Sequence, residues 1–237
     1  MQKEKAHTTG GEVTSDAKKH QYRKTEKETV SHMDQSTQKV LVLFAHPAQA
    51  SSEVNLHLFR DASATPSVTA VDLYYDYPDF NIDIEREQQR LLEHDTIIFL
   101  FPLFWYSTPS ILKEWQDLVL EYGFAYGQGG SALQGKKFLC AITAGGKEEA
   151  YQSDGFNHFT IRQLLQPLEQ MARITQMAYI APFALFGSRT AQEEKRIETH
   201  RQKWQQLLNM LVNDTLNMSK ATRLENLADL CTKEGNH

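Results

Sequence analysis

Short apolar runs alternate with amphipathic stretches along most of the chain. Five runs have the length and the β-branched and aromatic content of strands, and three of these runs are almost unbroken, as in parallel strands covered on both faces. The predicted strands are Lys39–Ala45, Val68–Leu73, Thr96–Phe101, Lys137–Ile142 and Met177–Phe186. Helical periodicity occupies the intervals, at about Ser52–Ala62, Ile84–His94, Pro109–Tyr122, Phe159–Ala172 and Ala191–Leu211.

This alternation predicts an α/β fold. Right-handed crossovers between successive strands give a three-layer, doubly wound sheet of five parallel strands, with helices on both faces. Five strands favour the flavodoxin-like strand order, in which ligands bind at the carboxyl ends of the first and third strands. We therefore expect the functional residues at that edge of the sheet.

The two ends of the chain differ from its centre. Residues 1–38 are rich in Lys, Glu, Thr, Gln and His and almost lack apolar side chains, so we expect a disordered polar extension. A translation start at Met33 is the alternative interpretation. The flavodoxin-like domain is expected at 39–213, and a polar tail with a short helix at 214–237.

Composition narrows the class of function. The 237 residues carry 25 Lys and Arg against 30 Asp and Glu, a formal net charge of −5 that argues against nucleic-acid binding through clustered cations. No apolar run approaches the roughly 18 residues that span a bilayer. Two cysteines, Cys140 and Cys231, build neither a disulfide framework nor a zinc site, so we expect a cytoplasmic protein.

The segment after the first strand carries candidates for phosphate binding. It leads from His46 into a predicted helix, where an amino end presents free N–H groups and a positive dipole end. His46, Ser51, Ser52 and Asn55 can add hydrogen-bond donors. The alternative is an ordinary N-cap serine beside a loop histidine. The place of the segment on the fold favours phosphate.

Aromatic and small residues follow the third and fourth strands. Three consecutive aromatic residues on a short loop cannot all point inward, which favours a wall for a flat heteroaromatic ring over simple core packing. The third strand leads into Pro102, Leu103, Phe104, Trp105 and Tyr106, and the fourth into Thr143, Gly145, Gly146 and Tyr151. The three loops converge on one predicted crevice.

Together these motifs resemble the NAD(P)H:quinone oxidoreductase family of flavodoxin-like proteins, over Lys39 to about Leu211. The segment Gly123-Phe-Ala-Tyr-Gly127 adds to the resemblance. Within the family, the chain is most similar to the ancillary subunits of glutathione-gated potassium-efflux systems of bacteria. The segments Asp72–Asp83 and Leu165–Glu169 carry that similarity.

The resemblance implies a non-covalently bound flavin. Its expected neighbours are His46, Ser52 and Asn55 at the phosphate, Pro102, Leu103, Phe104 and Trp105 along the ring, and Thr143, Gly145, Gly146 and Tyr151 at the pyrimidine edge. We expect FMN rather than FAD, because the loop Gln49–Ser52 is short and no further basic residue follows it.

The resemblance also implies a homodimer with its sites at the subunit interface, where Tyr126 reaches the flavin of the other subunit. Tyr151, Tyr126 and His158 are the expected catalytic residues, with Asn157 as the alternative to His158. The expected reaction is a two-electron hydride transfer from NAD(P)H through FMN to a quinone. Two alternatives stay open: a regulatory subunit that docks on a potassium–proton antiporter at the inner face of the membrane, and a one-electron carrier.

Overall fold

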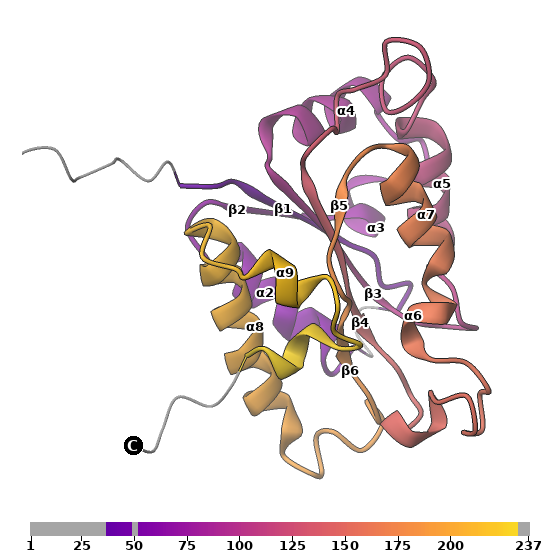
Figure 1. The fold of residues 1–237 in the computed structure, drawn as a ribbon, viewed down its shortest axis with the longest axis vertical. Helices are drawn as coiled ribbons and strands as arrows, with labels where there is room; N and C mark the ends of the chain where they lie inside the picture. The colour runs from indigo at the N-terminus through magenta and orange to yellow at the C-terminus, as the bar shows by residue number, and fades with distance from the viewer. Residues whose placement is uncertain (1–36, 49–51, 232–237) are drawn as a thin grey trace, which may run out of the picture. The chain divides into compact units, whose positions relative to one another are not determined.

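A parallel β-sheet forms the middle layer of the domain in the computed structural model, which describes residues 37–48 and 52–231 (Figure 1). The strands run in the order β2-β1-β3-β4-β5, and β6 also pairs with β4. Their bounds are Val40–Phe44 for β1, Val68–Asp72 for β2, Thr96–Pro102 for β3, Lys137–Thr143 for β4, Ala178–Tyr179 for β5 and Phe183–Leu185 for β6. The predicted extension lies, up to residue 36, outside the described residues.

The register of the sheet brings three loops to one edge. Phe44, the last residue of β1, is paired with Leu100 of β3, and Pro102 of β3 is paired with Thr143 of β4. Because all of these pairings are parallel, the loops after β1, β3 and β4 leave the sheet at the same edge. This is the edge where the sequence predicts the functional residues.

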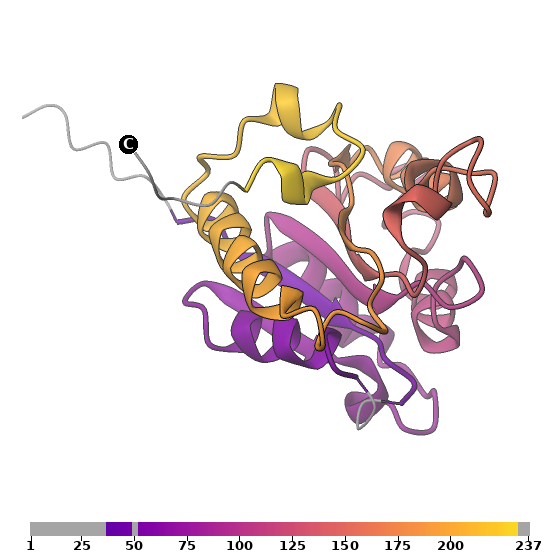
Figure 2. The same ribbon diagram turned by 90° about the horizontal axis from the view of Figure 1, so that it is seen from below.

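Helices cover both faces of the sheet (Figure 1 and Figure 2). Successive side chains of a strand point to opposite faces, so Leu41 and Leu43 pack in one apolar cluster, and Val40 and Val42 in another. The first cluster includes side chains of α4 (Ile84–Glu93), α5 (Ser110–Val119) and α7 (Gln166–Ile174), and the second includes those of α2 (Asn55–Ser63) and α8 (Arg196–Val212). The predicted three-layer, doubly wound fold is confirmed.

The short elements show where local sequence patterns mislead. The structure adds α3 (Leu73–Asp76), η2 (Glu148–Ala150), α6 (Ile161–Leu164), α9 (Met218–Ala221) and η3 (Leu227–Asp229). The single helix predicted over Phe159–Ala172 is split between α6 and α7, where Pro167 lies in the first turn of α7. Within the part of the chain that the structure describes, no helix is both long and apolar enough to cross a membrane.

The fifth predicted strand is interrupted. Both β5 and β6 pair with β4, and between them Pro182 has no N–H to donate to a ladder. Residues near the C-terminus supply partners at the interruption instead. The N–H of Ala181 donates to the carbonyl of Ala221 over 3.0 Å, and the carbonyl of Pro182 accepts from Leu227 over 2.8 Å.

Residues 214–231, after α8, include the short helix α9 and pack several apolar side chains against the domain. Leu216, Ala221, Leu227 and Cys231 are buried in the second apolar cluster. The side chain of Asn226 makes two hydrogen bonds to the backbone of β6. Its Oδ1 accepts from the Ala184 N–H and its Nδ2 donates to the Ala184 carbonyl, each over 3.0 Å. The segment therefore covers an edge of the sheet, as natural proteins do to protect unpaired strands.

Candidate functional site

A cleft of about 350 Å³ opens at the carboxyl ends of the strands. It is lined by His46, Ala48, Ser52, Glu53, Val54, Asn55, Pro102, Phe104, Thr143, Ser188 and Arg189. Six of these residues belong to the predicted site: His46, Ser52, Asn55, Pro102, Phe104 and Thr143. A larger hollow of about 690 Å³ lies over α6 and α7 and contains none of the predicted residues. We therefore take the cleft at the strand ends as the functional site.

His46 is a neutral donor in this cleft. Its side chain is buried, its Nδ1 accepts a hydrogen bond from the Ala48 N–H over 3.2 Å, and its ring meets Phe104 edge to face. Burial lowers the pKa of His46 below its ordinary value. Since Nδ1 is an acceptor, the proton of the neutral ring lies on Nε2, which can donate to a ligand.

Asn55 and Ser52 lie at the amino end of α2. Asn55 is almost fully buried, with 1% of its surface exposed, and its Nδ2 donates to Oγ1 of Thr143 over 2.9 Å. Its Oδ1 has no hydrogen-bond partner among the described residues. Ser52 lies two residues before Val54, the N-cap residue of α2, and its Oγ accepts from the Leu56 N–H over 3.0 Å. Ser52 is therefore not the N-cap residue, although its Oγ satisfies one N–H of the first turn, and its hydroxyl proton stays available to a ligand.

The predicted aromatic loop is a tight turn beside the cleft. The Ser107 N–H donates to the Phe104 carbonyl over 3.1 Å, and φ is +51° at Trp105 and +61° at Tyr106. Two left-handed residues are typical of a turn built on Asn-Gly, and bulky residues there are strained. Phe104 lines the cleft, but Trp105 is 93% exposed and does not. The contact of Trp105 with a flavin ring therefore stays a prediction.

Tyr151 and Asn157 lie behind this turn. Tyr106 Oη donates to Asn157 Oδ1 over 3.0 Å, whereas His158 is exposed. Tyr151 is buried against Phe186, and burial raises the pKa of Tyr151. A Cβ on Gly146 would lie only 3.2 Å from the Tyr151 ring. The absence of a side chain at Gly146 therefore allows the Tyr151 ring to lie close to the backbone. Of the two candidates at 157 and 158, Asn157 contacts the turn.

Seven predicted site residues do not line the cleft: Leu103, Trp105, Tyr126, Gly145, Gly146, Tyr151 and His158. Leu103 is buried in the core, and its N–H donates to the Thr143 carbonyl over 2.9 Å, which ties the loop to β4. Tyr126 lies in the connection between α5 and the amino end of β4. A role of Tyr126 at the cleft of another subunit stays a prediction.

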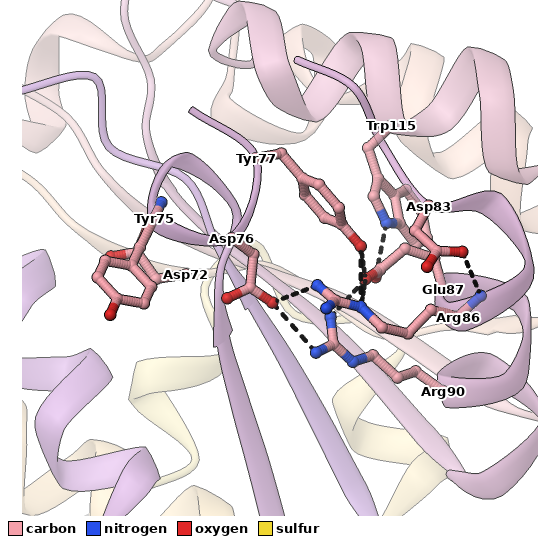
Figure 3. A network of polar contacts seen from close by, with 9 residues as sticks. All are labelled: Asp72, Tyr75, Asp76, Tyr77, Asp83, Arg86, Glu87, Arg90 and Trp115. Atoms are coloured by element: carbon pink, nitrogen blue, oxygen red, sulfur yellow. Dashed lines mark hydrogen bonds and ion pairs between the residues drawn. The ribbon is translucent and has the colours of Figure 1, made fainter. Parts of the chain in front are cut away.

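A buried carboxylate anchors α5, the helix that follows the aromatic turn (Figure 3). Glu87 of α4 is fully buried and accepts hydrogen bonds from Tyr77 Oη over 2.6 Å and from Trp115 Nε1 over 2.9 Å. Arg90 pairs with the same carboxylate, and Asp76 pairs with Arg90 over 3.1 Å. Burial and the neighbouring Glu87 raise the pKa of Tyr77 to about 12, so its hydroxyl remains a donor.

Sequence analysis missed the residues that follow β6. Ser188 and Arg189 line the cleft, and a Cβ on Gly145 would lie 3.3 Å from Arg189 Nε. No motif marks these two residues, although they follow the carboxyl end of a strand, where the fold gathers ligand-binding groups. The choice of FMN over FAD was based on the absence of a further basic residue after the first strand, whereas Arg189 reaches the cleft from the loop after β6. The loop after the first strand, at residues 49–51, lies outside the described residues.

Comparison with known proteins identifies the family, since the family model described as "Flavodoxin-like fold" matches residues 38–208. The chain belongs to this family. It is 46% identical over 157 residues to the glutathione-regulated potassium-efflux system ancillary protein KefG of Cronobacter sakazakii, covering 66% of this chain and 85% of KefG. It is 37% identical over 192 residues to the uncharacterized NAD(P)H oxidoreductase YdeQ of Bacillus subtilis, covering 81% and 98%.

Solved structures agree with this assignment. General stress protein 14 of Treponema denticola, in complex with FMN, is 33% identical with a TM-score of 0.69, covering 73% of this chain and 99% of that one. An NADPH-quinone reductase of P. pentosaceus is 31% identical with a TM-score of 0.65, covering 71% and 96%. The resemblance drawn from the sequence motifs is confirmed.

Proposed function

We propose that this flavodoxin-like protein is an FMN-dependent NAD(P)H:quinone oxidoreductase. The relatives named NAD(P)H oxidoreductase and NADPH-quinone reductase support this reaction class, and the FMN complex of general stress protein 14 supports the cofactor. The observation in this chain that carries the proposal is the buried Asn55. Its Oδ1 lacks a partner among the described residues and lies in a cleft with the amino end of α2.

The residues of the cleft fit a flavin mononucleotide. The amino end of α2 and the Nε2–H of His46 suit its phosphate, and a ribityl hydroxyl would satisfy the unpaired Oδ1 of Asn55. Phe104 and Pro102 would contact the flat ring. Gly145 and Gly146 make room for the side chains of Arg189 and Tyr151, and their own contact with the ring stays a prediction. We expect the flavin to lie along the cleft with its phosphate at the amino end of α2, its ribityl chain at Asn55 and its ring at Phe104 and Pro102.

The protein contributes binding, orientation and exclusion of water to the reaction. A bound flavin supplies the capacity to take a hydride from NAD(P)H and give it to a quinone. We assign Tyr151 as a neutral donor to the ring edge, since a tyrosine is protonated at neutral pH and burial raises the pKa of Tyr151 further. Phe104 on the strained turn would shield one side of the ring from water.

The test is to purify the protein, release its flavin and identify it by mass spectrometry. Quinone-dependent oxidation of NADH and of NADPH is then measured with a benzoquinone. We expect FMN and turnover with at least one nicotinamide. Failure to retain or rebind any flavin would refute the proposal, and FAD as the sole flavin would refute the choice of FMN.

We also propose a homodimer in which Tyr126 of the partner subunit completes the cleft. The support is the exposure of large aromatic side chains near the strand carboxyl ends, 93% at Trp105 and 85% at Phe156. Apolar surface of this kind usually marks an interface. Sedimentation should give a dimer, and Tyr126→Leu should raise the KM for quinone without altering the fold. A monomer at micromolar concentration would contradict this arrangement.

Regulation of a potassium-efflux antiporter is the second candidate function. The 46% identity with KefG favours it, and it is compatible with the oxidoreductase activity. We would measure the membrane-bound fraction in cells with and without a cognate transporter. Binding that requires the transporter would support docking, whereas equal binding to both membranes would contradict it.

A further inference from the structure

The cleft contains a cationic side chain, Arg189, to which the proposed function assigns no role. Arg189 follows β6 and lines the cleft with Ser188. No hydrogen bond or ion pair joins its guanidinium to another of the described residues. Arg189 is exposed, so its guanidinium is accessible to a ligand that binds in the cleft, where the buried Asn55 leaves its Oδ1 without a partner among the described residues.

The described lining of the cleft carries one charge of each sign. Glu53 and Arg189 are the charged side chains among its described lining residues, and His46 is kept neutral by burial. Arg189 is therefore the one cation in the described part of the cleft. A phosphate at the amino end of α2 would be repelled by Glu53, and Arg189 is placed to offset that repulsion.

The backbone leaves space for this guanidinium. A Cβ at Gly145 would lie 3.3 Å from Arg189 Nε and 3.9 Å from Cζ. The guanidinium therefore lies over the carboxyl end of β4, two residues beyond Thr143, the hydrogen-bond partner of Asn55. It reaches the cleft from β6, whereas α2 follows β1.

We propose that Arg189 clamps the phosphate of the bound flavin and selects phosphorylated over unphosphorylated flavin. The inference rests on the proposed function, because it requires a flavin in this cleft. A guanidinium presents paired N–H donors that match phosphate oxygens, and a phosphate monoester carries about 1.5 to 2 negative charges at pH 7. Backbone N–H groups at the amino end of α2 would hold the same phosphate.

The experiment compares FMN with riboflavin, which has the same ring and ribityl chain without the phosphate. Dissociation constants for both are measured by flavin fluorescence on apo-protein of the wild type, Arg189→Gln and Arg189→Lys. Arg223→Gln is the matched control, since Arg223 is exposed and does not line the cleft. Thermal unfolding of each apo-protein verifies that the variants fold.

We expect Arg189→Gln to weaken FMN binding about tenfold or more and to leave riboflavin binding unchanged. Arg189→Lys should lie between, and the salt dependence of FMN binding should shrink in Arg189→Gln. Equal losses for both flavins, or no loss for FMN, would overturn the clamp. The KM for NADPH is measured in the same variants. If Arg189→Gln changes only this KM and not FMN binding, Arg189 binds a phosphate of NADPH and the clamp is also overturned. A wild type that binds neither flavin would refute the proposed function instead.

Discussion

Asn55 Nδ2 and Thr143 Oγ1 are joined by a buried hydrogen bond of 2.9 Å across 88 positions of sequence. The bond ties the amino end of α2 to the carboxyl end of β4. Because the amide nitrogen is held by Thr143, the amide oxygen of Asn55 is the atom left for a ligand.

Thr143→Val removes the acceptor of this bond while keeping the shape of the side chain. A buried amide N–H without a partner costs about 1 to 3 kcal/mol, and we expect that loss in the free energy of unfolding of the apo-protein. Flavin binding should weaken as well, because the orientation of Asn55 is no longer fixed. Urea unfolding and flavin titration measure the two effects. Thr143→Ser, which keeps the hydroxyl, should behave as wild type; a Val variant as stable as wild type would contradict the assignment.

Trp105→Gly should fold more stably than Trp105→Ala. Both variants remove a side chain that is 93% exposed and packs little. The two variants differ at a backbone φ of +51°. This conformation destabilises the folded state by about 1 kcal/mol for alanine, whereas glycine adopts it without strain. Denaturant unfolding of the two apo-proteins measures the difference directly. Equal stabilities would show that the turn is not strained at this position.

Glu87→Gln should strongly destabilise the domain. A single amide oxygen cannot accept from Tyr77, Trp115 and Arg90 together, and loss of the charge leaves Arg90 without its buried partner. Breaking a buried ion pair in this way costs about 3 to 5 kcal/mol. Urea unfolding followed by tryptophan fluorescence is the measurement, and Glu85→Gln on the exposed face of the same helix is the control. A loss below about 1 kcal/mol would contradict a stabilising role for the network.

His200 should make the protein sensitive to acid. It is buried against Phe183, with ring centroids 4.4 Å apart, and burial lowers the pKa of His200 to about 3. Between the unfolded pKa of about 6.5 and the folded pKa, the unfolded chain binds a proton that the folded chain does not, so stability falls as the pH falls.

His200→Leu removes this proton linkage. Between pH 7 and pH 5 the wild type should lose about 2 kcal/mol more of its unfolding free energy than the variant does. Urea unfolding at both pH values provides the comparison. Parallel losses in the two proteins would show that His200 is not buried in its neutral form.

The residues whose place follows from the strand pattern were the predictable part of the site. Unbroken apolar runs identify β1, β3 and β4 as central parallel strands, and this places His46, Asn55 and Thr143 at one edge. The exposure of Trp105 was not predictable, because it depends on a turn with left-handed φ at two bulky residues, which local preferences disfavour. Arg189 lies on a loop without a motif, and only the packing around Gly145 reveals it.

The packing of the C-terminal segment was not predictable for a related reason. Leu216, Leu227 and Cys231 are spaced among polar residues, so their sequence shows no helix or strand period. They become core only because the break at Pro182 leaves backbone groups of the fifth strand in need of partners. Local patterns cannot report a pairing that depends on a distant interruption.

The two hydrogen bonds between Asn226 and the backbone of Ala184 limit how another protein can bind at β6. Many partners bind a sheet by adding a strand of their own to an open edge. At β6 the backbone groups of Ala184 are already taken by the chain itself, so that route is closed there without unfolding the C-terminal segment. A partner that approaches the sheet at β6 would therefore have to recognise side chains rather than add a strand, and single substitutions there can change the choice of partner.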